Sequence, residues 1–233
     1  MAIKITFQDV LQTTTAPAIA LGTRAETPDG RVWTYVQAST GGLAKGNVAV
    51  PAAATAVDTV SSSTDAQGRI VYITKASAGW TPGQFAEGWV VVDDGTGVGQ
   101  VAQIMGNTAD TLQLYPAYAL TTALAVADSD ITIRTPFVTV KALVTSLLQN
   151  SIGIAQVAFA ASSYGYVLTQ GVGTVIAGGA LVVGEYFATG DDTAGQVLAI
   201  TNGETIDDVQ VLGRALVANA AADQGVLVFV NIV

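Results

Sequence analysis

Acidic residues beside glycines are the groups in this sequence whose type and spacing could do chemistry. Asp93 and Asp94 open the run DDGTGVGQ at 93–100, and Asp191 and Asp192 lie within GDDTAG. Carboxylate oxygens are ligands that calcium prefers, so these four residues are the candidate metal ligands of the chain. Neither run has the spaced Asp or Asn residues and the final Glu of a calcium loop. The sequence therefore favours solvated turns over a metal site.

The glycines of the run at 93–100 could also cradle a phosphate group. A phosphate loop leads from a strand into a helix whose N-terminus holds the anion. Here the glycines lie between two expected strands, and the carboxylates of Asp93 and Asp94 would repel phosphate. A hairpin turn is the predicted structure of this run.

Catalysis has few candidate groups, because the chain contains no His and no Cys. The commonest general base, the triads that use it and thiol chemistry are all excluded. A glycosidase needs only two carboxylates, facing each other across a groove at roughly 5–10 Å. Glu87 with Asp93 or Asp94 is the pair that could serve, but nothing in the sequence raises the pKa of either acid. We expect no enzyme, no catalytic residue and no cofactor.

The composition predicts a folded protein whose surface is suited to being covered. Half of the 233 residues are hydrophobic, only 12% are charged, and the formal net charge is −9. This charge lacks the basic footprint of a nucleic-acid-binding protein, so DNA and RNA are not expected partners. No apolar run reaches the roughly 18 residues of a membrane span, and Asp9 falls where a signal peptide needs apolar residues. We expect a soluble protein with no membrane partner.

Short β-strands account for most of the hydrophobic pattern. Runs rich in β-branched and aromatic residues alternate with turns that contain Gly, Asp or Asn. Clear examples are RVWTYVQ at 31–37, RIVYITK at 69–75 and QVAQIM at 100–105. The pattern predicts an all-β fold of two β-sandwich or barrel-like domains. The last strand, GVLVFVNIV at 225–233, is so apolar that it must lie in the centre of a barrel or pair with another chain.

One short helix is expected between the two domains. Pro136 suits the first helical position, and Val140, Leu143, Val144, Leu147 and Leu148 recur with helical spacing before Asn150. The predicted organisation is an N-terminal arm at 1–30, a first β domain at 31–135, a connecting helix at 136–150 and a second β domain at 151–233.

A weak internal repeat relates the two predicted β domains. An aromatic-x-aromatic-Val unit precedes a run of small apolar residues that ends at a glycine, Gly46 in one copy and Gly184 in the other. The aromatic residues of the two units are Trp33 and Tyr35 in the first, and Tyr164 and Tyr166 in the second.

Aromatic residues on the expected strands could form a sugar-stacking or protein-contact surface, or lie half-buried within the sheets. Those considered are Trp33, Tyr35, Trp80, Trp89, Tyr164 and Tyr166. The arm at 1–30 has too little pattern to form a domain alone and could become ordered on a partner. The predicted interface residues are Phe7, Val10, Leu11, Trp33, Tyr35, Tyr164 and Tyr166.

Five blocks of the chain, in order, resemble the capsid decoration, or cement, proteins of tailed phages. The blocks are DGRVWTYVQA, LAKGNVAV, GWVVVDDGTGVGQVAQIMGN, IGIAQVAFAASSYGYVLTQGVGTVIAGG and LGRALVANAAADQGVLVFVNIV, and they span most of the chain from Asp29. The resemblance implies an all-β protein on the outside of the phage head, often a trimer, that locks major capsid protein subunits together. It implies no active-site residues, and the helix expected at 136–150 has no counterpart in the family pattern.

Two other classes of protein compete with this interpretation. A receptor- or glycan-binding appendage, such as a head fibre or tail module, would show exposed aromatic residues clustered on one tip. A major capsid subunit is a further alternative, but such shells usually depend on a long helix, and this sequence offers one short candidate. The sequence thus predicts a virion protein of the outer capsid surface, present in the host cytoplasm during assembly.

Overall fold

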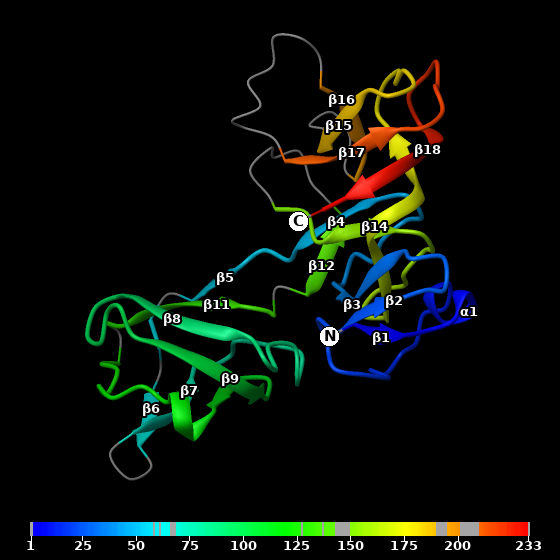
Figure 1. Ribbon diagram of the computed structural model, residues 1–233. Coiled ribbons are helices and arrows are strands. Elements are labelled where there is room, and N and C mark those ends of the chain that lie inside the picture. The colour runs from blue at the N-terminus through cyan, green and yellow to red at the C-terminus, as the bar shows by residue number, and fades with distance from the viewer. Residues whose placement is uncertain are drawn as a thin grey trace. The chain divides into compact units, whose positions relative to one another are not determined.

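The chain is almost entirely β-structure in the computed structural model (Figure 1), with 47% of residues in strands and 4% in helices. The structure describes residues 2–57, 59–60, 62–65, 69–126, 128–136, 138–142, 150–189, 195–200 and 210–232. Within these residues, no helix is long and apolar enough to cross a membrane. The all-β prediction is confirmed.

The chain divides into two compact units, and the division differs from the predicted one. Unit 1 combines residues Met1–Pro51 with Val138–Val233, and unit 2 is the continuous segment Ala52–Phe137. The residues expected to form an arm at 1–30 belong to unit 1, where strand β2 (Arg24–Glu26) pairs with β3 (Val32–Ala38). Unit 2 is therefore an insertion within unit 1 rather than the first of two successive domains.

The first part of unit 1 is a closed barrel of five strands. Its members are β3, β12 (Thr139–Ala142), β4 (Val48–Pro51), β13 (Gly153–Ala155) and the long β14 (Tyr164–Ala177). Pairing of β14 with β3 closes the ring. The residues inside it are small, which suits the narrow interior of a five-stranded barrel. The buried interior residues on its strands are Val36, Ala38, Ala49, Val140, Ala155 and Val167, and they form one core with Leu43 and Phe159 from the adjoining loops.

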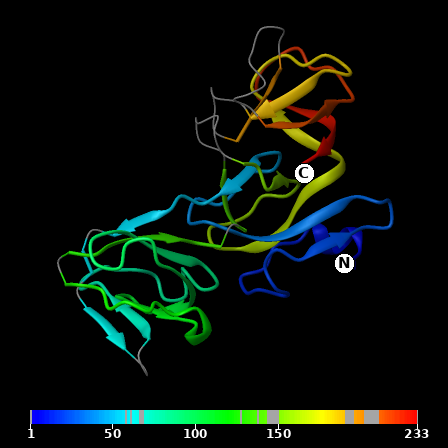
Figure 2. The same ribbon diagram turned by 60° about the vertical axis from the view of Figure 1, so that its left-hand side comes forward.

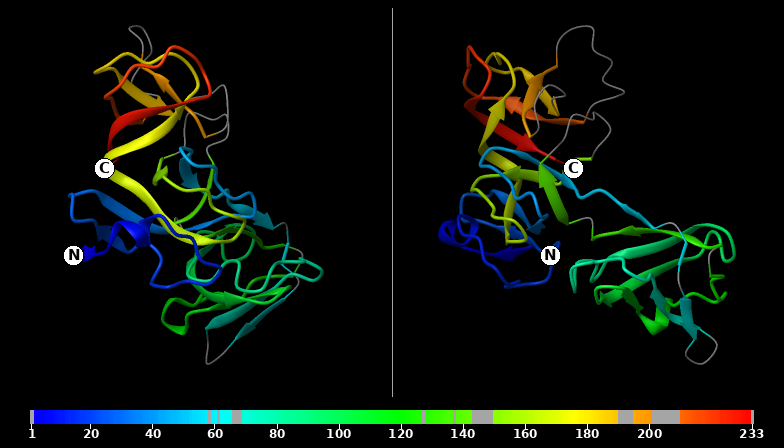
Figure 3. Two further views of the ribbon diagram at one scale, coloured as in Figure 1. Left: turned by 90° about the vertical axis from the view of Figure 1, so that its right-hand side faces the viewer. Right: turned by 180° about the vertical axis from the view of Figure 1, so that it is seen from behind.

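A second ring of five strands starts from the other half of β14. It contains β18 (Gln224–Asn231), β17 (Val211–Ala215), β15 (Tyr186–Thr189) and β16 (Val197–Ala199), and the pairing of Ala177 with Val197 closes it. Figure 3 shows β14 and β18 running alongside each other. Their register contains eight pairs of facing residues. The interior is lined by larger residues, among them Phe187, Leu212, Val226, Val228 and Val230.

The two rings, called here the first and second barrels, are structural repeats of one another. Each barrel uses the same five strand pairings in the same orientations. Strands β3, β4 and β13 of the first barrel correspond to β14, β15 and β17 of the second. Gly46 and Gly184 have φ angles of 84° and 83°, and their N–H groups donate to the carbonyl oxygens of Ala155 and Ala215. The bridge between Leu43 and Phe159 matches the bridge between Leu181 and Asn219.

The duplication corrects the predicted repeat in one respect. Gly46 and Gly184 are equivalent, as expected from the sequence. The counterpart of β3 is the second half of β14, whereas Tyr164 and Tyr166 lie in its first half, where they pair with Gln37 and Tyr35. The two aromatic units are therefore partners within the first barrel and not copies of each other.

The expected helix at 136–150 is wrong for the residues that can be compared. Thr139–Ala142 is strand β12, which pairs with both β3 and β4, while residues 143–149 lie outside the described part of the chain. Apolar residues do recur with helical spacing from Val140 onward in the sequence. The backbone of β12 is nevertheless extended, because it forms hydrogen bonds with two neighbouring strands.

The remaining elements of unit 1 form the N-terminal segment, residues 2–30. They are β1 (Ile3–Lys4), α1 (Phe7–Val10) and β2, with β1 parallel to β2. Thr6 caps α1, accepting a hydrogen bond from the Asp9 N–H at 3.2 Å, while the Asp9 carboxylate accepts from the Thr6 N–H at 2.9 Å. Val10 and Ala25 join the outer-face residues of the first barrel in one buried core.

Unit 2 is a curled, open sheet of seven strands (Figure 2). Its order is β5 (Thr55–Val57), β11 (Asp130–Arg134), β8 (Trp89–Asp94), β9 (Val101–Asn107), β10 (Thr111–Leu114), β7 (Ile70–Thr74) and β6 (Ser62–Asp65). A single-turn 3-10 helix, η1 (Pro116–Tyr118), follows β10. The concave face holds a core that includes Ile73, Phe85, Val90, Ile104 and Leu112. The strands expected at 69–75 and 100–105 are present, but only β8, β9 and β10 follow one another as neighbours in the sheet, because β7 pairs with β10 and β11 pairs with β8.

Candidate interaction surface

The candidate calcium ligands that the structure describes, Asp93 and Asp94, lie in a hairpin and accept hydrogen bonds from the protein. The Asp93 carboxylate accepts from the Thr132 hydroxyl at 2.6 Å, and the Asp94 carboxylate accepts from the Gly95 N–H at 2.7 Å. Asp128 closes the same turn, because its carboxylate accepts from the Thr96 N–H at 2.8 Å. That backbone hydrogen bond lowers the pKa of Asp128. The predicted turn at 93–100 is confirmed.

Metal binding gains no further support from the described residues. No group of three or more Asp, Glu, His or Cys side chains comes together among them. Asp191 and Asp192, the other two candidate ligands, lie outside the described part of the chain.

The two carboxylates considered for glycoside cleavage lie at opposite ends of one strand. Glu87 precedes β8, and Asp93 and Asp94 end it, so the strand alone separates them by about 16 Å at ~3.3 Å per residue. The Glu87 carboxylate accepts a hydrogen bond from the Tyr115 hydroxyl, and this bond raises the pKa of Tyr115. The spacing is too long for either glycosidase mechanism, which needs roughly 5–10 Å.

Four of the seven predicted interface residues are core residues of unit 1. Val10, Trp33 and Tyr35 are at most 2% exposed, and Tyr166 is 8% exposed. The ring of Tyr35 packs edge-on against Tyr166 at 5.0 Å and lies parallel to Tyr164 at 6.4 Å. Burial is the first cause that raises the pKa of Tyr166. The prediction is wrong for these four side chains, because they lie in one buried core in which the N-terminal segment packs against the first barrel, and Tyr164 is only partly exposed.

Phe7 and Leu11 are the predicted interface residues that lie on the surface. They sit four positions apart around α1, so they share one side of this turn. Phe7 is 41% exposed and Leu11 is 56% exposed, and Ile3 nearby is also exposed. Val10 between them points into the core and attaches α1 to the first barrel. The N-terminal segment thus holds apolar side chains outward on a fixed backbone.

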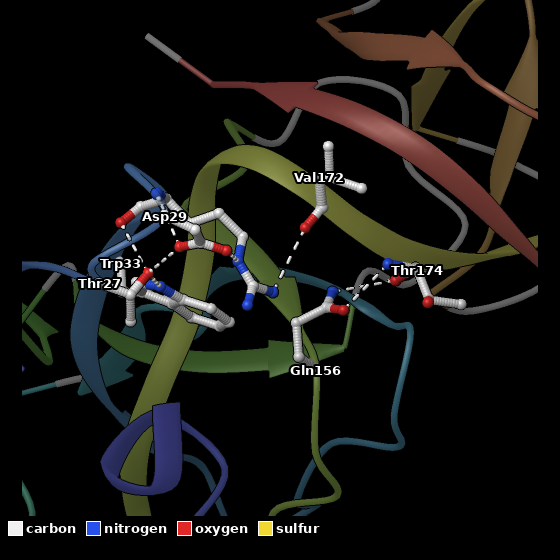
Figure 4. Close-up of polar contacts among 7 residues, drawn as sticks. Thr27, Asp29, Trp33, Gln156, Val172 and Thr174 are labelled. Carbon is white, nitrogen blue, oxygen red and sulfur yellow. Dashed lines mark hydrogen bonds and ion pairs between the residues drawn. The ribbon is translucent and has the colours of Figure 1, made fainter. Parts of the chain in front are cut away.

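Arg31 connects the N-terminal segment to the long strand β14 through Asp29 and Val172, which are labelled in Figure 4. Its Nε donates to the Asp29 carboxylate at 2.7 Å, and its Nη1 donates to the Val172 carbonyl at 3.5 Å. The guanidinium also lies over the rings of Phe7 and Trp33, at 5.2 and 5.3 Å from their centroids. Such contacts hold Arg31 at the place where β14 leaves the first barrel and enters the second.

Asp29 is held in its charged form at this junction. Burial is the largest single effect and raises the pKa of Asp29, but hydrogen bonds from Thr27 and Arg31 together outweigh it and lower the pKa. The Thr27 hydroxyl donates to Asp29 at 2.7 Å and accepts from the indole N–H of Trp33 at 3.2 Å (Figure 4). The ion pair is therefore tied to a fully buried tryptophan.

A further group of exposed apolar residues was not predicted from the sequence, and it lies on the outside of the second barrel. Val172, Phe229, Arg214 and Tyr186 form one row across β14, β18, β17 and β15, since each faces the next in the sheet register. Leu227 lies two residues from Phe229 on the same face. We call these five residues the outer patch, and its four apolar side chains are between 41% and 52% exposed.

Further apolar side chains border the outer patch. The main-chain N–H groups of Leu216 and Val217 donate to the Leu227 carbonyl. The loop that contains Val182 and Val183 runs beside them, because Gly184 N–H donates to the Ala215 carbonyl. All four border residues are at least 40% exposed. Monomeric soluble proteins rarely leave a contiguous apolar area of this kind in water, so the surface indicates a contact site.

Fold and surface together define the class of this protein: an all-β chain built on a duplicated five-stranded barrel, with an inserted β unit and an apolar outer patch. Comparison with models of protein families, with curated proteins and with solved structures found no match to this chain.

Proposed function

We propose that this chain is a non-enzymatic structural protein of a phage particle, a capsid decoration protein. It binds the outer surface of the mature head and stabilises the contacts between subunits of the major capsid protein. It acts as a homo-oligomer, with a trimer favoured by the resemblance of its sequence blocks to decoration proteins. The all-β fold and the exposed apolar surfaces support this proposal.

The main support for the proposal comes from the N-terminal segment, which presents apolar side chains on an anchored backbone. Ile3, Phe7 and Leu11 are exposed, whereas Val10 is buried beneath them. The backbone of the segment is held by the hydrogen bond from Ile5 N–H to the Glu26 carbonyl and by the capped turn at Thr6. Side chains held in place lose little entropy on binding, which favours a docking role.

Binding of this kind would stabilise a capsid by linkage. A ligand that binds only the mature lattice raises the stability of that lattice in proportion to the logarithm of its concentration relative to its dissociation constant. An oligomer that engages several subunits at once adds the effect of multivalency. Low surface charge helps such packing, because fewer charged groups must lose water.

Co-sedimentation with phage heads tests the proposal. We expect the purified chain to pellet with expanded heads and to stay in the supernatant with unexpanded heads. The double substitution Phe7→Ser and Leu11→Ser should weaken this binding at least tenfold, since buried interface anchors commonly contribute more than ~1 kcal/mol each. Val126→Ser, at an exposed apolar residue of unit 2, is the matched control and should bind normally.

A chain that binds neither expanded nor unexpanded heads would contradict the proposal. Binding to host cells or polysaccharide instead would favour a receptor- or glycan-binding appendage. Of the aromatic residues first considered for sugar stacking, Trp89 is clearly exposed, while Trp33, Tyr35, Trp80 and Tyr166 are buried. The aromatic cluster that such an appendage needs is therefore not formed by these residues.

A further inference from the structure

The outer patch cannot be explained by addition of a strand from a partner, because the main-chain groups beside it are already used. On β14, the side-chain amide of Gln156 donates to the Thr174 carbonyl at 3.0 Å and accepts from the Thr174 N–H at 2.9 Å (Figure 4). Arg31 donates to the Val172 carbonyl of the same edge. β18 has a neighbour on each side, β14 and β17. A partner must therefore meet this face with its side chains, as a folded surface does.

The first barrel shows that this outer face is one that the fold normally covers. The row equivalent to Val172, Phe229, Arg214 and Tyr186 is Trp33, Leu168, Ile154 and Val48, as the strand registers show. All four residues of the first-barrel row are 0% exposed. The same row of positions is thus buried in one repeat and exposed in the other.

The charge distribution indicates which partner fits. The chain carries 18 acidic and 9 basic residues, so two copies have the same net charge and repel each other overall. The outer patch contains no carboxylate, and its one charged group is Arg214, whose guanidinium lies 4.8 Å from the centroid of the Tyr186 ring. The outer patch therefore presents both a cation and the exposed rings of Tyr186 and Phe229. The cation of one copy can bind an aromatic ring of another copy.

We propose that the outer patch is a self-association surface, on which a second copy of the same chain packs. Burial of Phe229, Leu227 and Val172 supplies the apolar contact, and Arg214 of each copy stacks on aromatic rings of the other. The outer patch brings two acidic chains into contact at a place that contains no carboxylate. This inference concerns the isolated chain, so it can fail or hold independently of binding to phage heads.

The solution mass of the purified full chain, measured by light scattering from about 1 to 100 µM, tests the proposal. We expect an oligomer at the upper end of this range. Leu227→Ser and Phe229→Ser together should weaken association by about 30-fold or more, the effect of losing one strong interface anchor. Both side chains point outward, so the thermal unfolding midpoint of the variant at a concentration where both proteins are monomeric should match that of the unchanged chain.

A cysteine scan gives a second readout, because the natural chain contains no Cys. Leu227→Cys should form covalent dimers with a short bis-maleimide reagent at low micromolar protein. Val98→Cys, at an exposed position in unit 2, is the control and should remain monomeric under the same conditions. A chain that stays monomeric throughout overturns the proposal. An oligomer that persists in the double variant, or crosslinking through residue 98 alone, overturns it as well, whatever the result with heads.

Discussion

The first and second barrels of unit 1 share one strand plan but treat their outer faces in opposite ways. In the first barrel, the row from Trp33 to Val48 is fully buried, together with Val10 and Ala25 of the N-terminal segment. In the second barrel, the equivalent row from Val172 to Tyr186 stays exposed. The difference teaches that barrel closure alone does not decide which side of a strand is core. What covers the outside decides it, and among the residues that the structure describes only the first barrel has such a cover.

The largest expected effect comes from truncating the covered row. Trp33→Ala should lower the free energy of unfolding by about 3–5 kcal/mol, since it leaves a cavity under the N-terminal segment. The equivalent change Val172→Ala should cost less than about 1 kcal/mol in the monomer, because this side chain is already 41% exposed. Urea unfolding measures both. Equal losses would contradict the different burial of the two rows.

A smaller effect should distinguish the two equivalent glycines. Gly46 and Gly184 both have positive φ angles, so alanine at either costs about 1–2 kcal/mol in backbone strain. A Cβ at Gly46 would lie 2.8 Å from the Ile176 side chain and 3.1 Å from its backbone N, whereas at Gly184 the nearest atom is 3.7 Å away. Gly46→Ala should therefore be the more damaging by about 1 kcal/mol or more. Thermal and urea unfolding of the pair check this order.

The smallest effect concerns pH at the junction of the barrels. The pKa of Asp29 is lowered in the folded chain, so its contribution to stability is complete above its ordinary pKa, near 3.8, and is lost as the pH falls below that value. Asp29→Asn should remove this contribution and flatten the stability curve between about pH 4 and pH 2, by under ~1 kcal/mol because the pair is partly exposed. The comparison is made with urea unfolding at each pH. An unchanged slope would mean that Asp29 is not held by Thr27 and Arg31.

Much of the fold could be predicted from local pattern. The alternating segments at 69–75 and 100–105 became strands, and the acidic, glycine-rich run at 93–100 became a turn. Residues 139–142 could not be predicted in this way, because their strand depends on β3 and β4, which are distant in the sequence. The insertion of unit 2 was missed because local pattern does not reveal that β4 and β12, the strands at its two ends, pair with each other.

The exposed apolar surface was predicted only in part for a similar reason. Trp33 and Tyr35 are of residue types that are common in interfaces. They are covered by the N-terminal segment, and local sequence pattern does not predict that this segment packs on them. The outer patch did leave a signal, because β18 is apolar at Leu227 and Phe229 as well as at the inward Val226, Val228 and Val230. A strand that is apolar on both faces needs cover on both sides, and the sequence pattern alone does not say from which chain the second cover comes.

The position of unit 2 marks a site at which the duplicated barrel scaffold accommodates an inserted domain. Unit 2 leaves from β4 and returns at β12, two strands that pair directly, Pro51 with Val140. Its entry and exit are therefore only about 5 Å apart across one antiparallel pair. The second barrel makes the corresponding connection, from β15 to β16, with seven residues, 190–196. The scaffold therefore tolerates either a short loop or an entire domain here, which makes 52–137 the segment to replace when a foreign domain is to be displayed.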